Sequence, residues 1–106
     1  MKLIRIHKAV KKNLDSFDIL MKQRLTEVFG LLAAGENIGL PLSRPMPIVD
    51  HGCHEIRIKD RSGQYRIFYY TKMKDSILIF HFFKKKTQET PKNEIATAKI
   101  RLKEML

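Results

Sequence analysis

The basic residues in the second half of the chain have the chemistry and spacing that suggest a reaction. They stand in three successive stretches of sequence: Arg57, Lys59, Arg66, Lys84, Lys85 and Lys86. An arginine grips a phosphate through two parallel hydrogen bonds, and a lysine supplies a compact positive charge. A cluster of these side chains therefore suits a phosphodiester.

On RNA such a cluster can do more than bind. If it holds a 2′-hydroxyl in line with the neighbouring phosphorus atom, the hydroxyl attacks that phosphorus within the same molecule. The transition state gathers negative charge on the non-bridging oxygens, which preplaced cations stabilise. A lysine crowded by other cations loses proton affinity, so it can act as a general acid or base. This chemistry predicts RNA cleavage that needs no metal ion.

Each of these residues also has a simpler interpretation. Basic side chains on the open face of a strand are most often solvated surface, and three adjacent lysines are typical of a solubilising edge. His54 and His81 lie in apolar stretches, which favours partly buried, hydrogen-bonded histidines. Cys53 is the one cysteine, so an internal disulfide and a cysteine-rich zinc site are excluded and a small core residue is expected.

Three apolar stretches must position the basic residues. Residues 53–59 alternate between apolar and polar side chains, which predicts a strand with Arg57 and Lys59 on one face. Turn-forming residues separate it from two further strands, over 64–71 and 76–83. In an antiparallel meander the first strand's end, the second's start and the third's end meet at one edge. The basic groups are therefore expected to converge there and to point away from the core.

The first third of the chain predicts a strand and two helices. Residues 3–6 form a short apolar run, and residues 8–14 fit a first helical segment. Asp15 and Ser16 are good N-cap residues for a long amphipathic helix that stops at Gly35. The apolar stripe expected on that helix contains Phe17, Leu20, Met21, Leu25, Val28 and Leu32.

Proline residues mark the remaining boundaries. Three prolines and a glycine in residues 39–47 predict a loop without regular structure, and Thr90 and Pro91 predict the N-cap and first residue of a closing helix. We expect the long helix to cross one sheet face and to leave the face with Arg57 open to solvent. The expected fold is a small α+β domain over residues 1–106, with an N-terminal strand and two helices packed on an antiparallel sheet and a C-terminal helix.

Composition limits the class of protein. The chain has 106 residues, of which 43% are hydrophobic and 30% charged, so it can form a packed domain. A formal net charge of +10 favours a polyanionic partner, most often a nucleic acid. No apolar run approaches the roughly 20 residues that span a bilayer. The charged N-terminus does not resemble a secretory signal, so we expect a cytoplasmic protein with no membrane association.

Three segments, residues 54–59, 64–69 and 82–91, resemble toxins of bacterial type II toxin–antitoxin modules. More narrowly, they look like the HigB-type, phage-related branch of the RelE/ParE superfamily. The most specific element is the Lys-Lys-x-Thr-Gln-x-Thr-Pro motif at residues 84–91. One difference is Glu55, which stands where some RelE-type members carry a lysine.

The resemblance implies a RelE-like, microbial RNase-like fold in which helices cover one sheet face and a basic groove lies on the other. It implies ribosome-dependent cleavage of messenger RNA, without metal or other cofactor. In this reading Arg66 holds the scissile phosphate, Lys85 stabilises the transition state with Lys84 beside it, and Arg57 orients or activates the 2′-hydroxyl. Further RNA contacts are expected from Lys59 and Lys86.

The resemblance also implies partners. These are the ribosome with its messenger RNA and a cognate antitoxin, often a helix-turn-helix DNA-binding protein, in an assembly that can be a heterotetramer. Two alternatives stay open at this point: an inhibitor of DNA gyrase of the ParE type, and a noncatalytic RNA-binding module. A gyrase inhibitor does not need the basic cluster, so its presence favours the nuclease.

Overall fold

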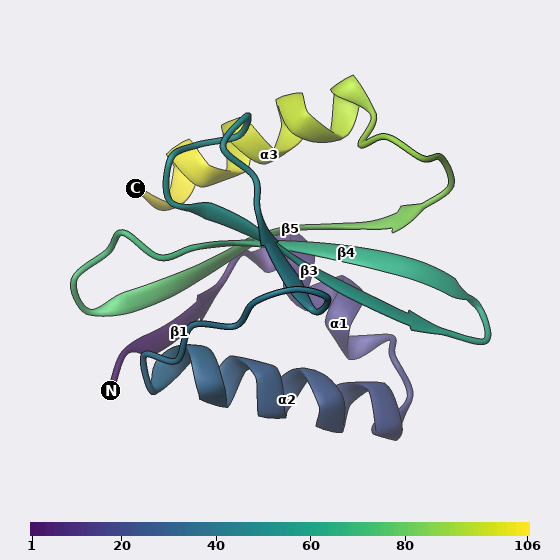
Figure 1. Ribbon diagram of the computed structural model, residues 1–106, viewed down its shortest axis with the longest axis horizontal. Helices are drawn as coiled ribbons and strands as arrows, with labels where there is room; N and C mark the ends of the chain where they lie inside the picture. Colours follow the sequence, from purple (N-terminus) through teal and green to yellow (C-terminus); the bar gives the residue numbers. More distant parts are fainter.

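The computed structural model describes all residues of the chain, 1–106, as five strands and three helices (Figure 1). In chain order these are β1 (Leu3–Ile6), α1 (Lys8–Asp15), α2 (Ile19–Ala33), β2 (Ser43–Pro45), β3 (Cys53–Asp60), β4 (Gly63–Tyr70), β5 (Ser76–Lys85) and α3 (Lys92–Met105). The predicted α+β fold is confirmed.

One sheet holds all the strands, in the order β1-β5-β4-β3-β2. Strands β3, β4 and β5 form the antiparallel meander that the sequence predicts, and β1 joins β5 in parallel. Strand β5 lies between β1 and β4, and its side chains enter hydrophobic cores on both faces of the sheet, in keeping with its nearly continuous apolar sequence.

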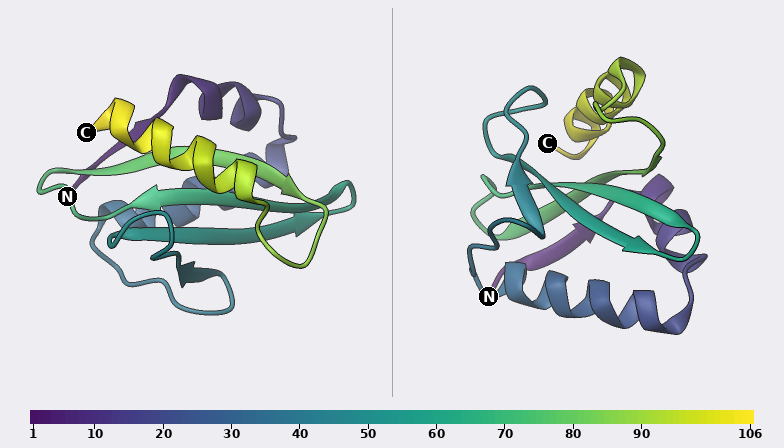
Figure 2. Two further views of the ribbon diagram at one scale, coloured as in Figure 1. Left: turned by 90° about the horizontal axis from the view of Figure 1, so that it is seen from above. Right: turned by 45° about the vertical axis from the view of Figure 1, so that its right-hand side comes forward.

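The two faces of the sheet carry separate hydrophobic cores, with α2 on one side and α3 on the other (Figure 1). On the first face Leu25 and Val28 of α2 pack against the meander, as expected for the stripe of a long amphipathic helix. The second core surrounds Phe68 and includes Leu102 of α3. Helix α3 lies over this face of the sheet (Figure 2). The expectation that this second face is open was wrong, because the apolar stripe of α3 covers much of it.

The start of α2 differs from the sequence prediction. Its N-cap is Asp18, whose Oδ1 accepts a hydrogen bond from the Met21 amide at 2.9 Å. Ser16, one of the two predicted caps, instead ends α1, because its amide bonds back to the Asn13 carbonyl. The helix therefore begins two residues later than Ser16 indicated and three later than Asp15 indicated, and Leu20 is 68% exposed rather than part of the buried stripe.

The proline-rich segment contains one short strand that the sequence analysis missed. Strand β2 pairs with residues 54–56 of β3 at the outer edge of the sheet. An edge strand tolerates Pro45 because its missing amide is not needed by a neighbour. Ser43 in the same strand is buried and lies 2.6 Å from the Tyr69 hydroxyl, which fixes β2 on the sheet.

Helix α3 is attached to the sheet through a buried histidine as well as through its apolar stripe. His81 of β5 is 2% exposed and lies 2.7 Å from Glu94 Oε1 and 3.0 Å from Arg101 Nη1. The prediction of a hydrogen-bonded histidine there is confirmed. Pro91 is the N-cap rather than the first helical residue, so α3 begins at Lys92.

Cys53 is 1% exposed and belongs to the second core, as predicted. Burial is the main cause that raises the pKa of its thiol, and the carboxylates of Asp50 and Glu55 add to it. None of the three helices combines the length and hydrophobicity of a bilayer-spanning segment.

Candidate active site

The register of the meander brings most of the predicted basic residues onto one face. Arg57 of β3 stands directly opposite Arg66 of β4, and Gln64 stands opposite both Lys59 and Lys85. Because residues two apart on a strand share a face, these five side chains project to the same side of the sheet. The strand register therefore confirms the prediction that Arg57, Arg66 and Lys85 converge on one face of the sheet.

The other two lysines of the run lie elsewhere. Lys84 pairs with Tyr65, whose ring belongs to the core under α2, so Lys84 projects to the opposite face from Lys85. Its stem passes over Gly63, where a Cβ atom would come within 2.5 Å of Lys84 Cε. Lys86 follows the last residue of β5 and is exposed. The expectation that Lys84 stands beside Lys85 at the site therefore does not fit the register.

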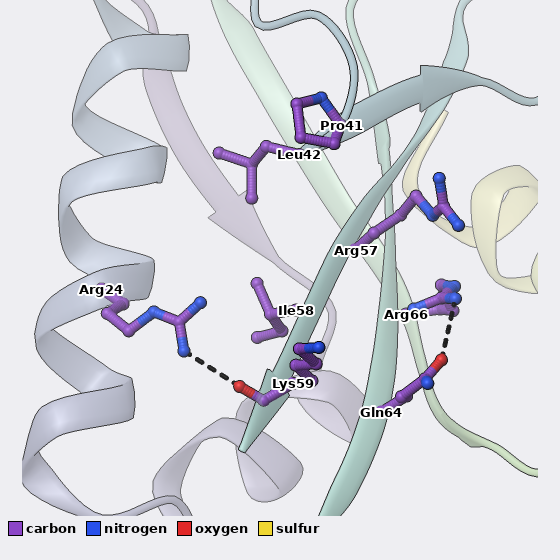
Figure 3. A pocket seen from close by; sticks show the side chains of 8 residues that line it. All are labelled: Arg24, Pro41, Leu42, Arg57, Ile58, Lys59, Gln64 and Arg66. Atoms are coloured by element: carbon purple, nitrogen blue, oxygen red, sulfur yellow. Dashed lines mark hydrogen bonds between the residues drawn. The ribbon is translucent and has the colours of Figure 1, made fainter.

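Arg66 is buried at the base of the cluster. It is 4% exposed, although we expected it to point out to solvent. It does point away from the core under α2, but the second core and its polar neighbours enclose it. Its guanidinium donates to the Tyr65 carbonyl at 3.1 Å. It also donates to Gln64 Oε1 at 3.4 Å (Figure 3). Burial is the main cause that lowers the pKa of Arg66, and it outweighs the nearby carboxylate of Glu55.

Glu55 supplies that carboxylate, and it is fully buried. Its Oε1 lies 2.9 Å from Nε of Arg44, 3.5 Å from Nε of Arg66 and 3.9 Å from Nε of Arg57. Like charges directly opposite each other on neighbouring strands destabilise a sheet, as Arg57 and Arg66 would. The negative charge of Glu55 offsets this repulsion and allows the two arginines to stay together.

Lys85 stands next to this cluster, opposite Gln64. Burial lowers the pKa of its ammonium group, and the positive charges of Arg66, Arg57 and Arg44 lower it further, while Glu55 acts in the opposite direction. A lysine crowded by other cations loses proton affinity, as expected from the sequence, and Lys85 is in that environment.

A cleft of about 420 Å³ opens beside the cluster and reaches round the sheet edge towards α2 (Figure 3). The residues that line it are Arg24, Pro41, Leu42, Arg57, Ile58, Lys59, Gln64 and Arg66. Arg24 of α2 donates a hydrogen bond to the Lys59 carbonyl at 3.1 Å and so closes one end of the cleft. Lys59 itself is exposed, at the position where the sequence placed an RNA-binding residue.

Three residues of this region were not assigned a role from the sequence. The alternation of residues 53–59 put Glu55 on the face of Arg57, so its position could have been recognised. Arg44 gave no such signal because it lies in a segment that the prolines marked as irregular. Arg24 lies on α2, far from the cluster in sequence, and only the tertiary fold brings it to the cleft.

The arrangement has the chemistry of a site for phosphate groups. Arg57 and Arg44 have partly exposed side chains, at 34% and 41%, and each guanidinium is held near Glu55 through Nε. The forked ends of these two side chains are therefore available to an anion. Arg66 and Lys85 lie beside them with lowered pKa values, which gives four cations around one carboxylate.

Comparison with known families places the chain in a family of phage-derived proteins. The model of a family described as phage derived protein Gp49-like (DUF891) matches residues 12–103 of the chain. No curated protein matches the chain. The matched range includes every residue of the cluster and of the cleft.

Proposed function

Because the chain belongs to the phage-derived Gp49-like family, a toxin-like family of the RelE/HigB type, we propose that it is the toxin of a type II toxin–antitoxin module. It belongs to the HigB-like branch and inhibits translation by cutting messenger RNA on the ribosome. The observation that carries this proposal is the register that puts Arg57, Arg66 and Lys85 on one sheet face.

The three cations have separate tasks in the reaction. Arg66, at the base of the cluster, holds the scissile phosphate, and Arg57 orients the 2′-hydroxyl of the preceding ribose. Lys85 places its charge on the non-bridging oxygens, where negative charge accumulates in the transition state. Holding both groups in line makes the attack intramolecular, which removes much of the entropic barrier.

The chemical step is a transesterification within the RNA. The 2′-oxygen forms a bond to phosphorus while the bond from phosphorus to the 5′-oxygen breaks, which gives a 2′,3′-cyclic phosphate and a 5′-hydroxyl. The 2′-hydroxyl loses one proton and the leaving 5′-oxygen gains one, so the step is balanced without an oxidant or a second substrate. Lys85 is the cluster residue best suited to exchange a proton, because its pKa is lowered.

The surroundings of the site support a nucleic-acid substrate. The formal net charge of +10 favours association with ribosomal and messenger RNA, and Lys59 and Lys86 add contacts to phosphates at the exposed rim. We further propose that a helix-turn-helix antitoxin inhibits the protein by covering the cleft or by blocking its entry to the ribosome, in a complex that can be a heterotetramer. Its site of action is the cytoplasm, where translation takes place.

Expression of the protein in a bacterial host tests this function against its two alternatives. We expect growth arrest with messenger RNA cut within translated regions, and no cutting when translation initiation is blocked beforehand. Intact messenger RNA with loss of DNA supercoiling would show a gyrase inhibitor instead. Salt-sensitive RNA binding without either effect would show a noncatalytic module. Full cleavage by the Arg57→Ala, Arg66→Ala and Lys85→Ala variants would refute the assigned site.

A further inference from the structure

We propose that Glu55 is a positioning residue whose buried carboxylate holds the guanidinium groups of Arg44, Arg57 and Arg66 by their Nε sides, so that Arg44 and Arg57 present their forked ends to successive phosphates of single-stranded RNA. The inference rests on the proposed function, since it concerns the same site. It adds two residues to that site, Glu55 and Arg44.

The contact pattern is the first argument. All three arginines approach the same oxygen of Glu55, and all three do so through Nε rather than through the terminal nitrogens. The terminal nitrogens of Arg66 are used by the Tyr65 carbonyl and by Gln64. Those of Arg44 and Arg57 make no hydrogen bond within the protein. Glu55 thus holds Arg44 by a hydrogen bond at 2.9 Å and attracts Arg57 and Arg66 by charge, at 3.9 Å and 3.5 Å. The partly exposed forks of Arg44 and Arg57 stay free for a ligand.

The second argument is the energetic cost of the arrangement. Glu55 Oε2 and Arg66 Nε are buried without a hydrogen-bond partner. A buried polar atom left without a partner destabilises a fold, and hydrophobic residues of similar size would avoid the cost. A fold retains such a cluster most readily where function requires it, because fixed dipoles and charges are what a phosphate site needs.

The third argument is the placement of Arg44. It lies on β2, directly opposite Glu55, and extends the row of cations over four neighbouring strands, from β5 to β2. Strands in a sheet are about 4.8 Å apart, so the row spans about 14 Å across the sheet. That length accommodates more than one phosphate of an RNA strand that crosses the strands of the sheet.

The test compares Glu55→Gln with the wild-type protein in cleavage of messenger RNA on programmed ribosomes. Glutamine keeps the shape and one acceptor oxygen but removes the charge that orders the arginines. We expect kcat to fall about a hundredfold, as for other small misplacements of reacting groups. The affinity for a single-stranded RNA oligonucleotide stays equal or becomes tighter, because one negative charge is lost. Glu27→Gln, the same change on the exposed face of α2, is the matched control and keeps full activity.

Two further variants keep the inference testable. Glu55→Asp restores the charge with a shorter reach, and we expect it to recover part of the lost kcat. If Glu55→Gln does not fold, Arg44→Lys tests the inference instead. This variant keeps the charge of a partly exposed side chain but removes the Nε donor that contacts Glu55. We expect kcat to fall about tenfold in Arg44→Lys. Arg5→Lys on β1, at the other edge of the sheet, is the control and cleaves as the wild type does.

The results separate this inference from the function on which it rests. A folded Glu55→Gln variant with wild-type kcat overturns the positioning role, and so does a loss that appears only as a raised KM. If the wild-type protein itself cleaves nothing, the proposed function fails. In that case the RNA affinity of Glu55→Gln, Arg57→Ala and the double variant is measured to test the inference. Changes in binding free energy that are not additive support coupling between the two side chains, and additive changes contradict it.

Discussion

Arg57 and Arg66 stand directly opposite each other on neighbouring antiparallel strands, with Glu55 Oε1 3.9 Å and 3.5 Å from their Nε atoms. Two guanidinium groups in such positions repel each other, and the buried carboxylate is what makes the pair tolerable. Both residues line the cleft, with Arg66 buried beside the second core and Arg57 partly exposed. In the proposed function, this pair is the site at which the protein binds a phosphate of the RNA.

The buried member of the pair gives the first prediction. Arg66→Lys keeps the positive charge but loses the planar guanidinium, which bonds to the Tyr65 carbonyl and Gln64 Oε1 and has further N–H groups for the scissile phosphate. We expect kcat for ribosomal cleavage to fall about a hundredfold, with little change in affinity for the ribosome. Arg5→Lys is the matched control on the far edge of the sheet. Wild-type cleavage by a folded Arg66→Lys variant would show that the fork has no role.

The lowered pKa of Lys85 leads to a prediction for how cleavage depends on pH. Its pKa is below the usual 10.5 because of burial and the charges of Arg66, Arg57 and Arg44, with Glu55 opposing them. The protonated amine is the form that stabilises the transition state, so kcat declines as the pH rises through this lowered pKa. Glu55→Gln removes the opposing charge and moves the decline to lower pH.

A kcat profile against pH, measured for wild type, Glu55→Gln and Lys85→Arg, checks this prediction. Lys85→Arg keeps its charge at alkaline pH, so any activity that it retains does not show the decline. A shift of the Glu55→Gln profile to higher pH, or an unchanged decline in Lys85→Arg, would contradict the role of Lys85.

The protonation of buried His81 determines how acid is expected to affect the stability of the fold. Arg101 can only donate a hydrogen bond, so His81 accepts at Nδ1 and donates from Nε2 to Glu94, as a neutral ring. Burial lowers its pKa from the usual 6.5, and the charges of Arg101 and His7 add to this, although Glu94 opposes them. The unfolded chain then binds a proton that the folded chain does not, so the free energy of unfolding falls as the pH drops below about 6.5.

Urea unfolding of wild type and His81→Gln from about pH 8 to about pH 5 measures this effect. We expect the variant to be less stable at neutral pH, because it loses hydrogen bonds to α3. Its stability should also fall less steeply with acid than that of the wild type. Equal slopes for the two proteins would place the acid sensitivity in another group, of which His54, with a pKa also lowered by burial, is the first to examine.

The meander and its face assignment could be predicted because β-strand alternation is a local property of the sequence. Ile56 and Ile58 fall in the core under α2, and Arg57 falls on the other face, as period-two spacing requires. The direction of Arg66 away from the core under α2 followed from the same rule, whereas Lys85 was singled out from the three adjacent lysines by the family resemblance. Lys84 was expected beside Lys85, but a shift of one residue along a strand changes the face, so it projects to the opposite side of the sheet.

Other features depended on tertiary contacts that local patterns do not encode. Asp15, Ser16 and Asp18 are all competent N-caps, and the choice among them depends on where α1 ends. Strand β2 exists because Ser43 and Arg44 find partners in Tyr69 and Glu55, far away in the sequence. The burial of Arg66 likewise required the second core, which the prediction of one helix-covered face left out.

The most direct test of the catalytic cluster compares two adjacent lysines at the end of β5. Lys84→Ala and Lys85→Ala make the same chemical change one residue apart, but on opposite faces of the sheet. Messenger RNA cleavage on translating ribosomes should be lost in Lys85→Ala, by about a hundredfold or more in kcat, and should stay near wild type in Lys84→Ala. Equal losses in the two variants, or a larger loss in Lys84→Ala, would contradict a catalytic cluster on the face of Arg57 and Arg66.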